Sequence, residues 1–416
     1  MNKFTKFTGW KWIPSLYFAE GLPYVIVMTV SVIMYKNLEL SNTKIALYTS
    51  WLYLPWIVKP LWSPFIDIIK TKRWWIIFTQ LLLGGGLAGI SFALTTNFYL
   101  AMSLAFFWIL AFSSASQDVS ADGFYMIGLN EEEQSFFVGI RSTFYRIGML
   151  FGQGLIVIIA GYLSKEFGFQ NAWAITFSIL ASVFISLSCL HYFTLPKVEE
   201  KKKSMNILKD YFISFKSFFA KKNILIILLF ILLYRFGEAQ LAKLASPFLL
   251  DTYEKGGLAL STSEVGFIYG TIGVICLVVG GIIGGIVVSK NGLRYWIFPM
   301  ALAMKLPDLV YVFLSIYKPD SYILICSCIG IEQLGYGFGF TAFMLYLIHV
   351  SKGEYKTAHY AIATGIMALG MMIPGMISGY IQEWLGYTNF FIWVLICTIP
   401  GLALIPFLNI PKDKKF

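Results

Sequence analysis

The sequence predicts an all-α integral membrane protein with twelve transmembrane helices arranged in two six-helix bundles. Of its 416 residues, 58% are hydrophobic and 13% are charged, and this charged share is about half that of an ordinary soluble domain. Uncharged apolar runs of about twenty residues recur along the whole chain, and each is long enough to cross a bilayer as a helix. One long polar connection near the middle divides the runs into two sets of six.

The twelve predicted spans are separated by short loops, except at the centre of the chain. They are residues 12–36, 43–66, 74–95, 98–128, 136–163, 169–194, 222–250, 261–289, 294–317, 321–350, 357–384 and 387–409. The long polar connection reads "LPKVEEKKKSMNILKDYFISFKSFFAKK" and lies between the sixth span and the seventh. We therefore predict an N-terminal bundle over 1–195, a linker over 196–221 and a C-terminal bundle over 222–416.

The placement of Lys and Arg predicts the orientation of these spans. Of the 32 basic residues, 22 lie on the side that holds the linker and both termini. The opposite side carries Lys36, Lys44, Lys165, Lys255 and Lys318. Because short loops rich in Lys and Arg stay in the cytoplasm, both termini are predicted to be cytoplasmic. The net charge of +10 is therefore a topology signal, and no nucleic-acid partner is expected.

A faint internal repeat relates the two predicted bundles. The loop after the second span reads "SPFIDIIKTKRWW", and the loop after the eighth reads "GIVVSKNGLRYW". Both place basic residues and a tryptophan at matching positions, about 220 residues apart. This pattern favours a transporter whose parallel halves enclose a cavity at the membrane midplane. The alternative is another twelve-helix protein, such as a membrane enzyme.

Two carboxylates interrupt the apolar fourth span in the stretch "SSASQDVSADGFY". Asp118 and Asp122 lie four residues apart and therefore share one face of a helix. Counting from the turn between the fourth and fifth spans places Asp118 level with Arg146, and Asp122 level with 141–143. Since a charge inside a bilayer needs a partner or a watery cavity, we expect ion pairs here. Two like charges on one face also disfavour joint ionisation, so the pair is a candidate proton-coupling site or, alternatively, a static latch.

Further ionisable and aromatic side chains lie inside the predicted spans. Arg235 can pair with Glu238, and Lys305 with Asp308, because each pair is three residues apart. The candidate substrate-binding residues are Arg235, Glu238, Lys243, Lys305, Glu332, Tyr24, Tyr145 and Tyr336, and Glu20 joins the candidate proton-coupling residues. The cations suit an anionic substrate, and tyrosines can stack on sugar rings. For each residue alone, internal pairing or packing is the competing interpretation.

The sequence predicts no enzymatic chemistry. The three histidines, His191, His349 and His359, all fall at span ends and form no catalytic triad or metal site. No phosphate-binding loop is present, so ATP is not the expected energy source. The five cysteines lie in apolar runs without the flanking residues of a zinc or redox site and are expected to be buried and inert. We expect no metal and no cofactor.

Several motifs resemble those of one transporter family. "YFAEGLP" in the first span, "SWLYLPWIVKPLWSPFID" in the second, and "ASQDVSADGFYMIGL" followed by "RSTFYRIGM" are similar to the AmpG-type muropeptide permeases of the major facilitator superfamily. Acetyl-CoA transporters share related motifs. The resemblance covers most of the chain but is specific only in the first five spans.

The resemblance implies a proton-driven importer of GlcNAc–anhydroMurNAc, with or without peptide, in the bacterial inner membrane. It also implies that the paired aspartates, here Asp118 and Asp122, are functionally important. In the superfamily the loop after the second span has Asp followed by Arg as a gating latch. Here Asp67 is followed by Ile68, and Ser289 replaces the Asp in the second copy. The expected partners are a small anionic substrate, protons and the lipid bilayer, and we expect a monomer.

Two other functions are compatible with the sequence. The first is transport of another organic anion, such as acetyl-CoA or a peptide. The second is a membrane sensor or scaffold that transports nothing. A scaffold has little reason to bury ionisable groups in both halves of the chain, and this favours transport.

Overall fold

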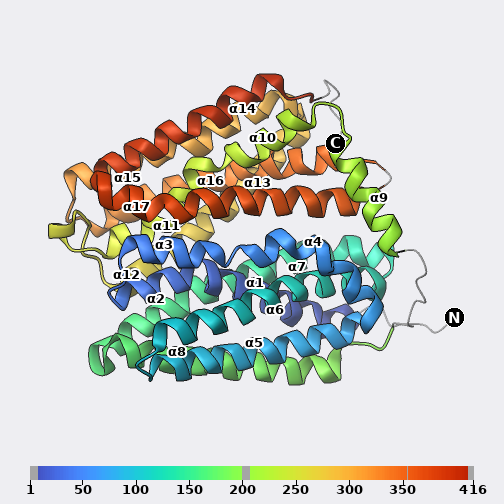
Figure 1. Ribbon diagram of the computed structural model, residues 1–416, viewed down its shortest axis with the longest axis horizontal. Coiled ribbons are helices and arrows are strands. Elements are labelled where there is room, and N and C mark those ends of the chain that lie inside the picture. Colours follow the sequence, from blue (N-terminus) through green and yellow to red (C-terminus); the bar gives the residue numbers. More distant parts are fainter. Residues whose placement is uncertain (1–7, 199–206, 354, 411–416) are drawn as a thin grey trace. The chain divides into compact units, whose positions relative to one another are not determined.

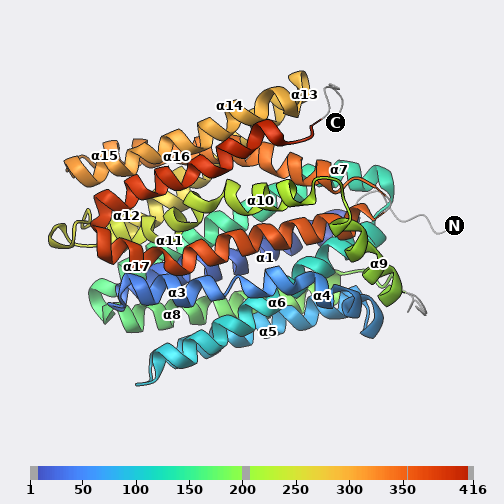
Figure 2. The same cartoon turned by 45° about the horizontal axis from the view of Figure 1, so that its top comes forward.

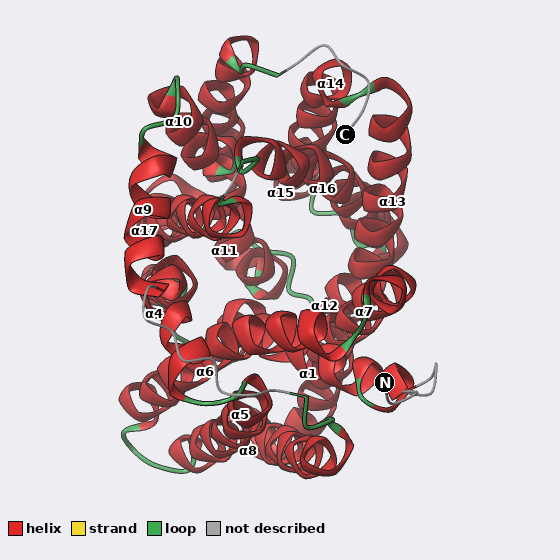
Figure 3. Ribbon diagram, turned by 90° about the vertical axis from the view of Figure 1, so that its right-hand side faces the viewer, coloured by secondary structure: helices red, strands yellow, loops and turns green. Residues whose placement is uncertain are grey.

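The computed structural model describes residues 8–198, 207–353 and 355–410, and every regular element within these ranges is helical (Figures 1 and 3). The chain forms two compact units. Unit 1 comprises Met1–Met34 and Val58–Ile207, and unit 2 comprises Tyr35–Ile57 and Leu208–Phe416. Tyr35–Ile57 therefore packs within unit 2, although it lies between two segments of unit 1. The division into two bundles of six spans stays a prediction.

Unit 1 is built from long helices that pack in pairs. α5 packs against α6 and α8, and α1 packs against α7 (Figures 1 and 2). The helices are α1 (Ile13–Val25), α2 (Ser31–Asn37, shared with unit 2), α4 (Leu54–Ile69, in unit 1 from Val58), α5 (Lys72–Leu94), α6 (Tyr99–Gly128), α7 (Glu131–Leu150) and α8 (Ile156–Thr194). Two five-residue π-helical turns, Ile26–Val30 and Phe151–Leu155, join α1 to α2 and α7 to α8.

Local sequence determines where these helices begin and break. The Thr71 side chain caps α5 by accepting a hydrogen bond from the Trp74 backbone N–H, 3.2 Å away. At the start of α7, Asn130 and Glu133 form a capping box, in which each side chain accepts from the other residue's backbone N–H. Gly168 has φ +71° and divides α8 into two segments, since the left-handed region is readily available only to glycine.

Glycines allow α1 and α7 to approach closely. A Cβ atom added at Gly21 would lie 2.2 Å from the backbone oxygen of Tyr145. A Cβ atom at Gly148 would lie 2.5 Å from the backbone oxygen of Phe18. A glycine of each helix therefore lies against the backbone of the other helix, the arrangement that small residues permit in membrane proteins.

Unit 2 contains the remaining helices and an additional helix in the predicted linker. They are α3 (Asn42–Trp51), α9 (Ile207–Phe219), α10 (Ile224–Tyr234), α11 (Phe236–Leu250), α12 (Thr262–Phe267), α13 (Val274–Asn291), α14 (Leu293–Lys305), α15 (Leu309–Tyr317), α16 (Tyr322–Val350) and α17 (Lys356–Leu404). α13 and α14 pack on α16, whereas α3, α10 and α11 pack on α17. Gly386, with φ +73°, divides α17.

The membrane-spanning character predicted from the sequence is confirmed. Within the described ranges, nine helical stretches are long and apolar enough to cross a membrane. Two of them contain the breaks at Gly168 and Gly386, which fall between predicted spans. The second predicted span corresponds to α3 and α4, which are interrupted near Leu52. The number of crossings stays a prediction. The helix α9 was not predicted, because the linker was interpreted only as a polar connection.

Candidate functional site

The carboxylates of α6 form ion pairs inside unit 1. Arg141 Nη1, from α7, lies 3.1 Å from Asp122 Oδ1. Tyr17 on α1 joins the same pair, because its hydroxyl donates to Asp122 Oδ1 at 3.3 Å and accepts from Arg141 Nη1 at 3.0 Å. The Arg141 guanidinium also lies over the rings of Tyr17 and Tyr125, at 5.1 and 4.7 Å from their centroids. Three helices, α1, α6 and α7, therefore meet at Asp122. The contact with Arg141 agrees with the prediction that Asp122 lies at the same level as residues 141–143.

Asp118 has a different partner from the one predicted. Lys59 Nζ, on α4, lies 3.4 Å from Asp118 Oδ2. Arg146 has no carboxylate within ion-pairing distance among the residues that the structure describes. The predicted Asp118–Arg146 pair is therefore wrong for this conformation, because α4 supplies a closer cation than α7 does. Positions along the hairpin of the fourth and fifth spans carry no information about the second span, which supplies Lys59.

Glu20 is the third carboxylate of this cluster, and its surroundings differ from those of the two aspartates. Its side chain is 7% exposed. Its Oε2 atom has no hydrogen-bond partner within the described part of the chain. Glu20 lines a cavity of about 290 Å³ together with Tyr17, Asp122, Arg141, Ser142 and Tyr145. Each aspartate thus has a cation, whereas Glu20 faces a cavity with one oxygen unpaired.

A second cavity shares a wall with the first. It has a volume of about 440 Å³ and is lined by Asp122, Tyr125, Met126, Gln134, Val138 and Arg141. Asp122 and Arg141 line both cavities. Their ion pair therefore lies where the Glu20 cavity adjoins the other one.

Unit 2 has its own charge cluster, at two helix breaks. Arg235 lies between α10 and α11, and its Nε and Nη2 atoms donate to Glu238 Oε1 at 3.0 and 2.5 Å. Lys305 ends α14, where a short 3₁₀ turn follows, and its Nζ lies 3.7 Å from Glu238 Oε2. The predicted Arg235–Glu238 pair is confirmed. The predicted Lys305–Asp308 pair is wrong, because Lys305 reaches across to Glu238 instead.

Aromatic rings surround these charges. Arg235 Nη2 donates to the Tyr336 hydroxyl at 2.7 Å, and its guanidinium lies 4.9 Å from the Phe340 ring centroid. Lys305 Nζ lies 5.1 Å from the Tyr234 ring centroid. A cation over an aromatic face gains electrostatic stabilisation even without water. One carboxylate, Glu238, therefore lies within ion-pairing distance of two cations, and aromatic rings lie beside both.

Lys243 is a buried cation without a carboxylate partner among the described residues. It is 2% exposed, and its Nζ donates to Thr49 Oγ1 at 3.0 Å. The Tyr53 ring centroid lies 5.2 Å away. Ser50 on the same helix as Thr49 is fully buried, and its hydroxyl has no partner in the described part of unit 2. This buried cation therefore has a hydroxyl and an aromatic ring beside it and no described carboxylate, an arrangement in which an additional anion would be stabilised.

Glu332 and Asp308 are the other buried acids of unit 2. The Tyr311 hydroxyl donates to Glu332 Oε2 at 3.3 Å, and Gln333 Nε2 donates to the same atom at 2.9 Å. The Tyr269 and Tyr311 hydroxyls are 2.7 Å apart, so they extend this network. Asp308 is 4% exposed, and its Oδ2 has no hydrogen-bond partner within the ranges described.

The structure therefore groups most of the predicted site residues into two clusters, one in each unit. Tyr145 lines the Glu20 cavity. Tyr24 lies on α1, four residues after Glu20, and is half-buried. The Asp67 side chain lies outside the described residues. Sequence reasoning did not assign Lys59 to Asp118, nor Thr49 to Lys243. Lys59 is detectable as a basic residue within an apolar run, whereas Thr49 has no distinguishing signal.

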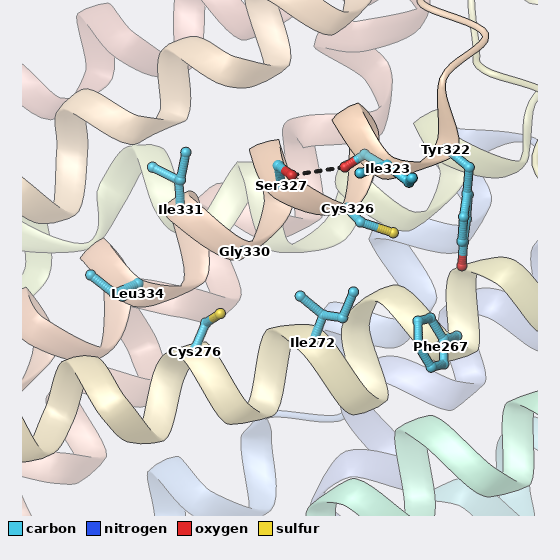
Figure 4. A pocket seen from close by; sticks show the side chains of 10 residues that line it. All are labelled: Phe267, Ile272, Cys276, Tyr322, Ile323, Cys326, Ser327, Gly330, Ile331 and Leu334. Atoms are coloured by element: carbon cyan, nitrogen blue, oxygen red, sulfur yellow. Dashed lines mark hydrogen bonds between the residues drawn. The ribbon is translucent and has the colours of Figure 1, made fainter.

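A third cavity, of about 540 Å³, is apolar and carries no charged side chain (Figure 4). Phe267, Ile272 and Cys276 line one side, and residues of α16 from Tyr322 to Leu334 line the other. Such a groove suits hydrocarbon and not an ion. The described cysteines form no disulfide. The prediction that they are buried is confirmed for Cys326, Cys328 and Cys397 but is wrong for Cys189, which is exposed on α8, and for Cys276, which is only half-buried.

Buried ion pairs and polar cavities inside a bundle of membrane-spanning helices are typical of polytopic transporters. The comparisons with known proteins agree with that class. The family model of the Major Facilitator Superfamily matches residues 15–355, which is most of the chain. The chain belongs to the Major Facilitator Superfamily and has the fold of its transporters.

Relatives agree with this membership, and a solved structure shows the same fold. The chain is 27% identical over 413 residues to AmpG 4 of Rickettsia conorii, with 94% of each chain covered. It is 26% identical over 394 residues to the anhydromuropeptide permease of Escherichia coli K12, with 93% of this chain and 77% of the permease covered. The crystal structure of a bacterial homologue of the human lysosomal transporter Spinster matches with a TM-score of 0.71 at 14% identity, covering 97% of each chain.

Proposed function

We propose that this protein is a proton-coupled secondary transporter that imports anhydro-muropeptides from the periplasm to the cytoplasm. The observation that carries the proposal is the similarity, over 93% of the chain, to a permease named for anhydromuropeptides. The charge clusters of the two units are compatible with it, because they supply both an acidic site for protons and basic residues for an anionic substrate. The location is the bacterial inner membrane, with both termini in the cytoplasm.

Protons bind at the carboxylate cluster of unit 1. Three acids, Glu20, Asp118 and Asp122, face two cations, Lys59 and Arg141. The two ion pairs stabilise the charged aspartates, whereas Glu20 has an unpaired, buried oxygen. Since a lone charge inside a membrane protein is costly, Glu20 is the carboxyl that gains most from binding a proton. The Asp122–Arg141 pair controls access to it.

The anionic groups of the substrate are recognised in unit 2. Lys243 is the candidate with the greatest need for a counter-charge, since it donates to a hydroxyl and has no carboxylate partner among the described residues. Arg235 and Lys305 share one carboxylate, so an added substrate carboxylate would balance their charge. Tyr336, already bonded to Arg235, would contact the sugar rings.

Uptake into proteoliposomes tests the proposal directly. The purified protein is reconstituted, and a labelled GlcNAc–anhydroMurNAc peptide is supplied outside at acidic or neutral pH. We expect accumulation when the outside is acidic, and only equilibration when the two sides have equal pH. Uptake that ignores the pH gradient would contradict proton coupling. Uptake of acetyl-CoA or an unrelated peptide in place of the muropeptide would contradict the substrate, and no uptake of any solute would favour a sensor or scaffold.

A further inference from the structure

The linker helix α9 is attached to unit 2 by one of its faces. Phe218 is fully buried in the hydrophobic core that also contains Phe230 and Tyr346. On the same side, Ser217 Oγ lies 2.8 Å from His359 Nε2, and the Ser214 backbone oxygen lies 3.2 Å from the same nitrogen. These contacts fix the rotation of α9 about its own axis. The helix runs crosswise to α10 and α17, near their ends (Figures 1 and 2).

From Phe212 onward, the opposite face of α9 is exposed and carries two phenylalanines with Lys216 between them. Phe212 is 70% exposed, and Phe219 is 42% exposed. Positions 212, 216 and 219 follow the spacing of one helical face, and Ile213 lies at its edge and is also exposed. A helix that is apolar on both faces is normally covered on both. Among the residues whose side chains are described, the face that contains Ser214 and Phe218 packs against unit 2, and Phe219 contacts the Phe218 ring at its border with a centroid distance of 5.4 Å.

Cations border this exposed face. Lys216 lies on it between the two phenylalanines, and Lys222 follows the helix end, both exposed. Lys221 Nζ reaches the backbone oxygen of Lys352 at 3.4 Å, which connects the end of α9 with the turn before α17. Lys356, at the start of α17, is also exposed. Aromatic side chains beside several lysines are typical of helices that lie in the interface of a bilayer with anionic lipids.

We propose that α9 is an interfacial anchor that inserts Phe212 and Phe219 among the lipids and binds anionic headgroups through Lys216 and Lys222. The side of the membrane is the one that the sequence predicts to be cytoplasmic, since α9 is the linker helix. An anionic bilayer fits better than a protein partner, because the helix adjoins membrane-spanning helices and the exposed Lys216 and Lys222 lie within one turn of the two phenylalanines. Anionic lipid would therefore hold the linker against the membrane surface and stabilise unit 2 through the contact with His359.

The proposal is tested by measuring the depth of α9 in vesicles of defined composition. Spin label is attached to Phe212→Cys in a full-length protein whose five native cysteines are replaced by alanine. Asp320→Cys is the aqueous reference, because Asp320 is exposed in a loop, and Ile373→Cys on α17 is the lipid reference. In phosphatidylglycerol vesicles, we expect the label at 212 to collide with oxygen more than with a water-soluble nickel chelate, as at 373. Equal accessibility of 212 and 320 to nickel would overturn the proposal.

A second measurement isolates the charges. Removing one lysine from an anionic surface should weaken binding about fivefold, so Lys216→Gln with Lys222→Gln should weaken stabilisation by phosphatidylglycerol markedly. The matched control is Lys255→Gln with Lys318→Gln, two lysines outside the α9 region. We expect the control to retain the lipid-dependent rise in melting temperature. Equal loss in both double variants, or equal stabilisation by phosphatidylcholine, would overturn the recognition of anionic lipid. None of these results depends on which solute is transported.

Discussion

The two units both hold charges within membrane-spanning helices, but they hold them in different ways. In unit 1, the Asp122 and Arg141 side chains are 49% and 30% exposed, beside two cavities. In unit 2, the Arg235, Glu238 and Lys305 side chains are at most 10% exposed. An ion pair that borders a cavity can separate at little cost because water replaces the lost partner. A buried pair cannot separate without leaving an uncompensated charge.

This difference in exposure suggests different roles for the two sets of charged residues: proton coupling in unit 1 and stability of the fold in unit 2. The pair in unit 1 is suited to change partners during a transport cycle, and a substitution there should affect coupling more than folding. The cluster in unit 2 sits at the breaks between α10 and α11 and after α14, where it also holds the helices together. A substitution there should affect folding first. The predictions below test this division, in order of decreasing effect on stability.

The largest effect is expected for Glu238→Gln. Glu238 is the one carboxylate paired with both Arg235 and Lys305 among the described residues, so its neutralisation leaves two buried cations unbalanced. Removing one partner of a buried pair costs about 3–5 kcal/mol. We expect a strong decrease in folded protein after detergent extraction, measured by size-exclusion chromatography and thermal unfolding.

A matched control makes the same Glu→Gln change at a buried position where no cation loses its partner. Glu332→Gln removes a buried carboxylate that accepts hydrogen bonds from Tyr311 and Gln333, which are neutral. It should therefore destabilise the protein much less than Glu238→Gln does. Similar yields and melting temperatures for both variants would show that the Arg235–Glu238–Lys305 cluster is not an anchor.

The next effect concerns the packing that stabilises unit 1 in place of buried ion pairs. Gly21→Ala would place a Cβ atom 2.2 Å from the Tyr145 backbone oxygen, so α1 and α7 must separate. Overpacking of this kind costs about 1–3 kcal/mol. The control is Gly85→Ala in α5, where a Cβ atom meets nothing within 4 Å. We expect a lower melting temperature for the first variant and an equal or higher one for the second.

Much of this fold was predictable from apolar run length, because a bilayer requires long uninterrupted helices. The predicted span 98–128 corresponds to α6 (Tyr99–Gly128), and 321–350 corresponds to α16 (Tyr322–Val350). The partners of the buried charges were less predictable. Spacing along a helix gives Arg235–Glu238, but it cannot give Lys59–Asp118 or Lys305–Glu238, which depend on how distant helices pack. The helix α9 was missed because a polar linker with interspersed phenylalanines has no span-length apolar run.

A smaller effect on stability, with a clear effect on ligand binding, is expected for Lys243→Gln. Lys243 is buried beside Thr49 and pairs with no carboxylate within the described part of unit 2, so its neutralisation leaves no unpaired negative charge there. Its neutralisation should change the free energy of unfolding by about 1 kcal/mol or less, and in the stabilising direction. Binding of an acidic muropeptide should weaken about tenfold, which corresponds to one lost charged hydrogen bond. Binding of a neutral disaccharide should be unchanged in the same calorimetric titration; equal loss for both ligands would indicate a structural role.

The smallest effect on stability is expected for Asp122→Asn, and it is the sharpest test of the comparison between the units. Arg141 keeps its contacts with Tyr17 and Tyr125, so the loss of one partly exposed ion pair should cost less than about 1 kcal/mol. The other carboxylate that lines the same cavity as Arg141 is Glu20. Once Asp122 is neutral, the Arg141 charge favours ionised Glu20, and the carboxyl proposed to take up the proton then resists protonation.

Asp122→Asn should therefore abolish accumulation driven by a pH gradient, while exchange of substrate between equal pools continues. Glu20→Gln, which removes the proposed proton site itself, should show the same uncoupling. Both variants must be compared with the unmodified protein in the same proteoliposomes, with melting temperatures measured beside transport. A stable Asp122→Asn protein that still concentrates substrate would reduce the Asp122–Arg141 pair to a static latch. A variant that does not fold would contradict the division between units, because it would show that unit 1 also depends on its ion pair for stability.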